Sequence, residues 1–139
     1  MARILSIDYG EKRCGVAISD PLKIIANAYS VYSPNEIMQE LEKIINEKEV
    51  DTIVVGYPIN MKGEKTSTTL LVDKFIDELK KKFPNVTIEK LDERLTSKIA
   101  QQTLILSGTK KSDRQKKSNT DLISATILLQ NYLDMINNK

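Results

Sequence analysis

Three acidic positions lie in separate parts of the chain, each beside a segment predicted to form a strand or to begin a helix. Asp8 ends a short apolar run, Asp92 and Glu93 end another, and Asp121 lies near the start of the last helical pattern. A carboxylate beside a buried strand is costly unless it is hydrogen-bonded or bound to a cation. Converging acids repel one another unless cations lie between them, and two Mg²⁺ or Mn²⁺ ions held by carboxylates are a usual device for displacement at phosphorus. The pattern gives the hypothesis of a site formed by Asp8, Glu93 (or Asp92) and Asp121, with a metal ion as its cofactor.

Each of these acids also has a purely structural interpretation. Asp8 precedes Tyr9-Gly10 and suits a tight turn that closes a hairpin. Asp92 suits a turn, and Asp121 suits the entry of a helix. Arg94, beside the second acidic position, could clamp a phosphate bidentately or form a salt bridge with Asp92 or Asp8.

The composition restricts the chemistry available to the chain. The 139 residues include no histidine and one cysteine, Cys14, with 40% hydrophobic and 29% charged residues. These numbers fit one domain spanning 1–139 with a single core. They exclude Ser-His and Cys-His nucleophiles, histidine-ligated metals and an intramolecular disulfide. Carboxylates, lysines, hydroxyls and oxygen-ligated metals remain, and Cys14 is expected to be a small buried hydrophobe.

Positive charge is concentrated rather than spread over the chain. The net charge is only +2, so a nucleic-acid partner would need a local basic patch. Residues 109–118 carry five basic residues, one acid and no apolar residue, which predicts a flexible loop. The candidate nucleic-acid contacts are Lys62, Arg94 and the basic residues of that loop, which are Lys110, Lys111, Arg114, Lys116 and Lys117. A solvated surface loop is the other interpretation of this segment.

The apolar pattern predicts an α/β domain. Two short strands around residues 4–8 and 15–18 precede a third over 24–32, and Ser33 with Glu36 suits a capping box that begins a helix ending near Glu49. The apolar pattern then predicts a strand over 53–56, a helix over 66–83 with Leu71 on its core face, and a strand over 86–91. A helix from 96 or 97 to 106 follows, and a last helix begins at Asn119 or Thr120. The order β-β-β-α-β-α-β-α-α implies one mixed five-stranded sheet with helices on both faces.

This order brings the candidate residues to one edge of the sheet. Ligands of parallel sheets gather outside the carboxyl ends of the strands. Asp8, the loop 56–63 and the pair Asp92–Glu93 all follow strands, and the first and fourth strands are expected to be neighbours. Asp121 is expected in the first turn of the last helix, where the helix dipole favours a carboxylate.

Four sequence blocks resemble the signature blocks of the YqgF (RuvX) family, whose members are similar to the RuvC Holliday junction resolvases. They are IDYGEKRCGVAISD (7–20), GYPINMKG (56–63), LDERLTS (91–97) and KKSNTDLISATILLQNYLD (116–134). The resemblance implies an RNase H-like fold, and it adds Asn60 to Arg94 and Lys116 as nucleic-acid contacts. It also implies a divalent-metal nuclease with Asp8, Glu93 and Asp121 as catalytic and metal-binding residues, holding two Mg²⁺ or Mn²⁺ ions.

The role that the resemblance implies is maturation of the 5′ end of pre-16S rRNA during ribosome biogenesis, with pre-rRNA and the ribosome or its precursor as partners. Two alternatives stay open: resolution of branched DNA, and binding of RNA or the ribosome without catalysis. A sugar-kinase-like phosphotransferase fits poorly, because the chain is short for two domains that close around ATP. No secretory signal or membrane span is expected, so we predict a cytoplasmic monomer or weak homodimer.

Overall fold

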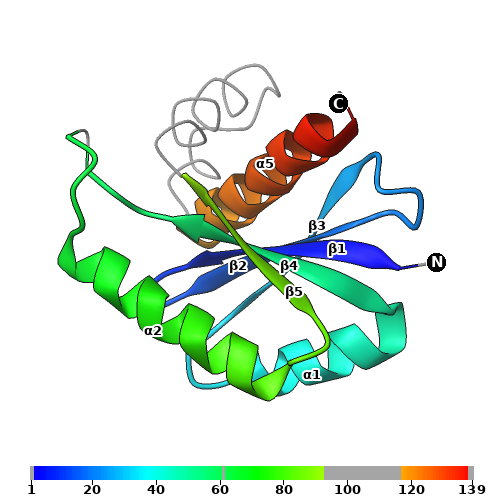
Figure 1. Ribbon diagram of the computed structural model, residues 1–139, viewed down its shortest axis with the longest axis horizontal. Coiled ribbons are helices and arrows are strands. Elements are labelled where there is room, and N and C mark those ends of the chain that lie inside the picture. Colours follow the sequence, from blue (N-terminus) through cyan, green and yellow to red (C-terminus); the bar gives the residue numbers. More distant parts are fainter. Residues whose placement is uncertain (1, 61, 93–116, 138–139) are drawn as a thin grey trace.

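Five strands form one mixed sheet at the centre of the protein, in the order β3-β2-β1-β4-β5 (Figure 1). The computed structural model describes residues 2–60, 62–92 and 117–137, without the side chains of residues 117–120. The strands span β1 Arg3–Tyr9, β2 Cys14–Ser19, β3 Ala26–Tyr32, β4 Val50–Tyr57 and β5 Thr87–Asp92. β1, β2 and β3 pair antiparallel, whereas β1 pairs parallel with β4 and β4 with β5. The predicted mixed five-stranded sheet, with the first and fourth strands side by side, is confirmed.

Helices cover both faces of this sheet. α1 (Ile37–Lys48) and α2 (Ser67–Lys82) lie on one face, and α5 (Lys117–Asn137) crosses the other (Figure 1). The crossover through α1 returns the chain to β4 beside β1, as a parallel pair requires. The helix predicted over 96–106 lies outside the described residues.

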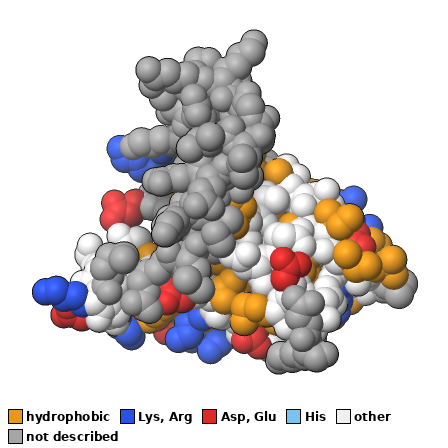
Figure 2. All heavy atoms as spheres, turned by 90° about the horizontal axis from the view of Figure 1, so that it is seen from above, with side chains coloured by type: hydrophobic (Ala, Val, Ile, Leu, Met, Phe, Trp, Pro, Cys, Tyr) orange, Lys and Arg blue, Asp and Glu red, His pale blue; other side chains and the backbone are white. Residues whose placement is uncertain are grey.

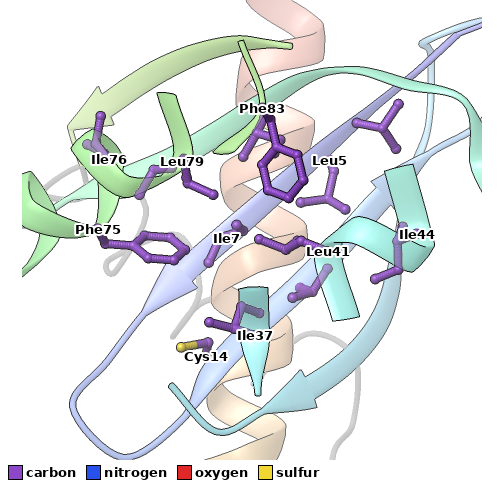
Figure 3. Close-up of a cluster of buried hydrophobic side chains, with 14 of the residues drawn as sticks. Leu5, Ile7, Cys14, Ile37, Leu41, Ile44, Phe75, Ile76, Leu79 and Phe83 are labelled. Atoms are coloured by element: carbon purple, nitrogen blue, oxygen red, sulfur yellow. The ribbon is translucent and has the colours of Figure 1, made fainter. Parts of the chain in front are cut away.

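The apolar side chains form two clusters, one on each face of the sheet. The cluster under α1 and α2 includes Leu5 and Ile7 of β1, Leu41 of α1 and Phe75 of α2 (Figure 3). The smaller cluster under α5 is formed by Ile4, Ala17, Val54, Ala125, Leu128, Leu129 and Leu133. Successive residues of β1 alternate between the two clusters, because side chains of a strand point to opposite faces.

The third strand begins two residues later than predicted. Ile24 and Ile25 are exposed, and their backbone N–H groups donate to Asp20 Oδ1 at 2.7 and 2.9 Å. The N–H of Leu22 donates to the other carboxylate oxygen of Asp20. The carboxylate therefore holds these residues in a turn, and the pairing of β3 with β2 begins at Ala26.

The first helix also begins later than predicted. Glu36 is the N-cap of α1, with no side-chain capping bond, and residues 34–36 form a turn instead. Half of the predicted capping box is present, since the Ser33 N–H donates to Glu36 Oε1 at 2.8 Å. This bond closes the turn that leads into the helix rather than the first turn of the helix itself.

Two other predictions for the helices are wrong. Leu71 of α2 is 39% exposed, and the core face of this helix is formed by Val72, Phe75, Ile76 and Leu79. The last helix begins at Lys117 rather than at Asn119 or Thr120, so residues 117 and 118 are helical and not part of a loop. Asp121 is therefore its fifth residue and lies beyond the first turn. The helix dipole acts most strongly within the first turn, so its effect on this carboxylate is smaller than predicted.

None of the helices among the described residues is long and apolar enough to span a membrane.

Candidate functional site

Asp8 lies near the end of β1 and faces α5. Ile4 of the same strand belongs to the cluster under α5, and the hydroxyl of Ser6 donates to the backbone oxygen of Ala125 at 2.6 Å. Because alternate residues of a strand share a face, Asp8 is on the same face as Ile4 and Ser6. Its side chain is half-buried. The carboxylate thus stands at the carboxyl edge of the parallel pair β1–β4, on the side that α5 covers.

Asp121 of α5 is brought to the same place by Gly15. Gly15 pairs with Asp8 across the β1–β2 ladder. A Cβ atom on Gly15 would lie 2.2 Å from the backbone oxygen of Asp121, well inside van der Waals contact. Only glycine lets the helix backbone approach β2 this closely.

The β1–β2 turn supplies a cation to this pair of acids. Arg13 Nε lies 3.2 Å from Asp121 Oδ2, and both side chains are partly exposed. Gly10 makes the turn possible, because a Cβ there would lie 2.7 Å from the backbone oxygen of Arg13. The turn therefore holds the guanidinium beside the Asp121 carboxylate.

Cys14, the first residue of β2, belongs to the apolar cluster under α1 and α2. Burial raises the pKa of the Cys14 thiol to about 11, and the negative charges of Asp8 and Asp121 add to that increase. A backbone hydrogen bond of Gly10 acts in the opposite direction. Cys14 is fully buried, as predicted for a small hydrophobe.

An open depression of about 390 Å³ lies beside Asp121. It is lined by Gly10, Glu11, Lys12, Arg13, Thr68 and Asp121. Thr68 belongs to the first turn of α2, so the depression joins the β1–β2 turn, α5 and the start of α2. Three segments that are distant in the sequence therefore form one polar surface at the carboxyl edge of the sheet.

The structure separates Asp92 from the other two acids. Leu91 of β5 packs in the cluster under α5, whereas Asp92 is in register with Tyr57, which packs in the cluster under α1 and α2. Asp92 therefore lies on the opposite face of the sheet from Asp8. Glu93, the preferred second acid, lies outside the described residues and stays a prediction.

The loop after β4 is organised by its own side chains. Asn60 Oδ1 accepts hydrogen bonds from the N–H groups of Lys62 and Glu64, at 3.0 and 2.9 Å. The hydroxyl of Tyr57 donates to Asp73 Oδ1 at 2.9 Å, and Lys65 Nζ donates to Asp73 Oδ2 at 3.2 Å. These bonds tie the loop to α2. Asn60 thus builds the loop, and its predicted contact with nucleic acid stays a prediction, as does that of the exposed Lys62.

The remaining predicted nucleic-acid contacts are Arg94 and the basic residues before and at the start of α5. Arg94 and four basic residues lie outside the described part of the chain, the four being Lys110, Lys111, Arg114 and Lys116. Lys117 is the first residue of α5.

The ring of Tyr9, the residue after Asp8, stacks on Phe75 in the core, with ring centroids 4.3 Å apart.

The donor set fits a hard divalent cation. Carboxylate oxygens are the ligands that Mg²⁺ and Mn²⁺ prefer, and an arginine already neutralises one of the two acids. In the described parts of the chain, no group of three acidic or cysteine side chains could hold a metal ion. A complete site would therefore need a third ligand from outside those parts, where Glu93 lies.

Sequence reasoning missed Lys12, Arg13 and Thr68 as site residues. Arg13 was part of a recognised block, but the ion pair joins residues separated by 108 positions. The only local signal was the pair of basic residues between Gly10 and Gly15.

Comparison with known proteins gives matches over nearly the whole chain. The sequence profile of the family described as "RuvX: Holliday junction resolvase" matches residues 2–135. A protein of Flavobacterium psychrophilum named "Putative pre-16S rRNA nuclease" is 44% identical over 96% of this chain and 97% of its own length. A protein of the same name from Phocaeicola vulgatus is 42% identical over 96% of both chains.

Solved structures share the fold at low identity. RuvC of Thermus thermophilus, in complex with a Holliday junction substrate, superposes with a TM-score of 0.59 at 10% identity, over 99% of this chain and 96% of its own. The mitochondrial Holliday junction resolvase of yeast gives 0.55 at 13% identity, over 99% and 82%. These likenesses confirm the RNase H-like fold. Together with the profile match and the relatives, they establish that the chain belongs to the RuvX (YqgF) family.

Proposed function

We propose that this protein is a divalent-metal-dependent endonuclease that hydrolyses phosphodiester bonds of pre-16S rRNA to mature its 5′ end during ribosome biogenesis. The observation that carries the proposal is the convergence of Asp8 and Asp121 at the carboxyl edge of β1 and β4, through the close contact of Gly15 with α5. The names of the relatives that are 40–44% identical support the choice of substrate.

In the proposed site, the carboxylates of Asp8, Asp121 and Glu93 bind one or two Mg²⁺ or Mn²⁺ ions. A metal ion held there would activate a water molecule and stabilise charge on the phosphate and the leaving oxygen. Asp8 and Asp121 contribute ligand oxygens, and the β1–β2 turn places Arg13 and Lys12 beside them. Asp92 has no part in this site, because it lies on the other face of the sheet.

One experiment compares two substrates. Purified protein with Mg²⁺ or Mn²⁺ is incubated with an end-labelled RNA spanning the 5′ end of 16S rRNA and its leader, and separately with a four-way DNA junction. The proposal expects faster cleavage of the RNA and no cleavage in excess chelator. Faster cleavage of the junction would overturn the choice of RNA. Binding of the RNA without cleavage at any metal concentration would favour a non-catalytic RNA-binding or ribosome-binding factor.

Resolution of branched DNA is the second candidate, favoured by the description of the matching family. Symmetric cleavage of a junction calls for two sites related by a two-fold axis, hence a dimer. Light scattering coupled to size-exclusion chromatography, with and without the junction, measures this directly. A monomer in both conditions would count against symmetric resolution.

A further inference from the structure

Arg13 has an unusual position for a surface arginine, because it joins the proposed metal ligand to the depression beside it. Its Nε lies 3.2 Å from Asp121 Oδ2, and the same side chain lines the depression with Lys12 and Thr68. This bond uses only one of the five N–H donors of the guanidinium. The rest of the group can serve a second anion without leaving the turn.

The side chains that line the depression carry balanced charges. Lys12 and Arg13 are positive, whereas Glu11 and Asp121 are negative, so the four side chains cancel one another. A divalent cation bound to Asp121 would make the lining positive by two charges and would take over the role of counter-ion from Arg13. A phosphate would then find two cationic side chains and the hydroxyl of Thr68 around it.

We infer that Arg13 is a positioning and phosphate-binding residue. In the metal-free protein, it holds the Asp121 carboxylate. Once a divalent cation binds that carboxylate, Arg13 donates to a non-bridging oxygen of a backbone phosphate that enters the depression beside Lys12 and Thr68. This inference rests on the proposed function. It couples the two binding events, so a bound cation strengthens nucleic-acid binding and bound nucleic acid strengthens cation binding by the same factor.

If the ion pair between Arg13 and Asp121 were only structural, the expected result would differ. A partly exposed pair contributes little to stability, and its loss would leave cation and RNA affinity unchanged or would weaken both through loss of order. The inference instead requires opposite changes. Removing Arg13 removes a competitor of the metal, so cation affinity rises, and removes a phosphate contact, so RNA affinity falls.

The test measures both affinities on the full chain. Mn²⁺ binding is followed by electron paramagnetic resonance, and binding of a fluorescent RNA hairpin is followed by anisotropy in saturating Ca²⁺, with gels to confirm that the RNA stays intact. Arg13→Gln is expected to bind Mn²⁺ up to about five-fold more tightly. In the same variant, RNA binding weakens, and the slope of log K against log salt falls by about 0.7–0.9.

Three further variants separate the roles. Lys12→Gln is expected to weaken RNA binding with Mn²⁺ affinity close to wild type, because Lys12 lines the depression whereas the ion pair with Asp121 is made by Arg13. Arg13→Lys keeps the charge and restores the salt slope. Lys43→Gln, an exposed lysine of α1, is the matched control and changes neither affinity.

Two results would overturn the inference. One is a Mn²⁺ affinity of Arg13→Gln that equals or falls below wild type, and the other is an RNA salt slope equal to that of Lys43→Gln. If wild-type protein binds Mn²⁺ and cleaves RNA while either result holds, only the role of Arg13 fails. If wild-type protein neither binds Mn²⁺ nor cleaves RNA, the proposed function fails and the inference fails with it.

Discussion

Two residues determine where Asp121 lies, Gly15 in β2 and Arg13 in the turn before β2. Gly15 lets the backbone of α5 approach the sheet at Asp121, and Arg13 pairs with the Asp121 carboxylate. Asp8 stands across the ladder from Gly15. Gly15 and Arg13 thus position Asp121 near the edge of the sheet where Asp8 lies.

Cys14 lies between Arg13 and Gly15 in the sequence, and its thiol is fully buried. Its pKa of about 11 means that at about pH 8 only about one thiol in a thousand is ionised. We expect slow alkylation by iodoacetamide in the folded protein and fast alkylation in guanidinium chloride, followed by mass spectrometry. The native rate should rise with pH up to about 11 as the thiolate forms. A native rate equal to the unfolded rate near neutral pH would contradict the burial of this thiol.

At the scale of elements, the site depends on how α5 sits on the sheet. Its contacts include two small residues, Ala17 and Ala125, and the hydrogen bond from Ser6 to the backbone oxygen of Ala125. Close approach here is what carries Asp121 to the edge where Asp8 lies.

Gly15→Ala should therefore displace α5. The added Cβ would overlap the backbone oxygen of Asp121, so we expect a loss of about 1–3 kcal/mol in the free energy of unfolding. Ser6→Ala, which removes one buried hydrogen bond, should cost about 1 kcal/mol. Urea unfolding followed by circular dichroism measures both, with the exposed Asn27→Ala of β3 as control. A Gly15→Ala variant as stable as that control would show that α5 does not approach β2 this closely.

The start of α2 makes a second prediction at this scale. Thr66 and Thr69 form a reciprocal capping box, and the hydroxyl of Thr69 also donates to the backbone oxygen of Pro58. Thr66→Ala should lower the free energy of unfolding by about 0.5–2 kcal/mol, because N–H groups of the first turn lose a partner. Ser67→Ala, one residue on and exposed, should change it by less than about 0.5 kcal/mol. Equal losses in the two variants would argue against the capping box.

At the scale of the whole molecule, positive and negative charges nearly balance, with 21 basic and 19 acidic residues. Figure 2 shows basic, acidic and apolar side chains interspersed on the face that it presents. Together with a net charge of +2, this leaves local clusters to attract a polyanion.

The basic segment before α5 is the strongest such cluster in the sequence. Replacing Lys110, Lys111 and Lys116 by glutamine should lower the salt slope of RNA binding by about 2, because each phosphate contact on a single strand adds about 0.7. The matched control replaces Lys80, Lys81 and Lys82 at the end of α2, at the same cost in charge. Fluorescence anisotropy at several salt concentrations measures both slopes. Equal reductions would mean that net charge, and not this segment, drives binding.

Much of the fold could be predicted from periodicity, because burial on both faces marks the central strands. Ile4, Leu5 and Ile7 show this pattern, and the placement of Asp8 at the carboxyl edge followed from it. The turn at Asp20 could not be predicted, because Ile24 and Ile25 have strand-forming side chains and only the hydrogen bonds of Asp20 hold them out of β3.

For the candidate site, too, only part of the arrangement could be predicted from the sequence. The type and strand position of Asp8 are local properties, whereas the pairing of Arg13 with Asp121 depends on how α5 packs over β2. Asp92 and Glu93 are neighbours in sequence, and only the register of β5 with β4 places Asp92 on the far face. Contacts set by tertiary packing were therefore the part that sequence patterns could not supply.

The central claim is that Asp8 and Asp121 form a metal-dependent site for phosphodiester hydrolysis. The most direct measurement is the rate of Mg²⁺-dependent cleavage of the leader-containing RNA by wild type, Asp8→Asn and Asp134→Asn, the last being an exposed aspartate of α5. The account predicts that Asp8→Asn loses about 100-fold or more in rate while Asp134→Asn cleaves like wild type. Cleavage by Asp8→Asn at the wild-type rate, or a wild-type rate unchanged by chelator, would contradict it.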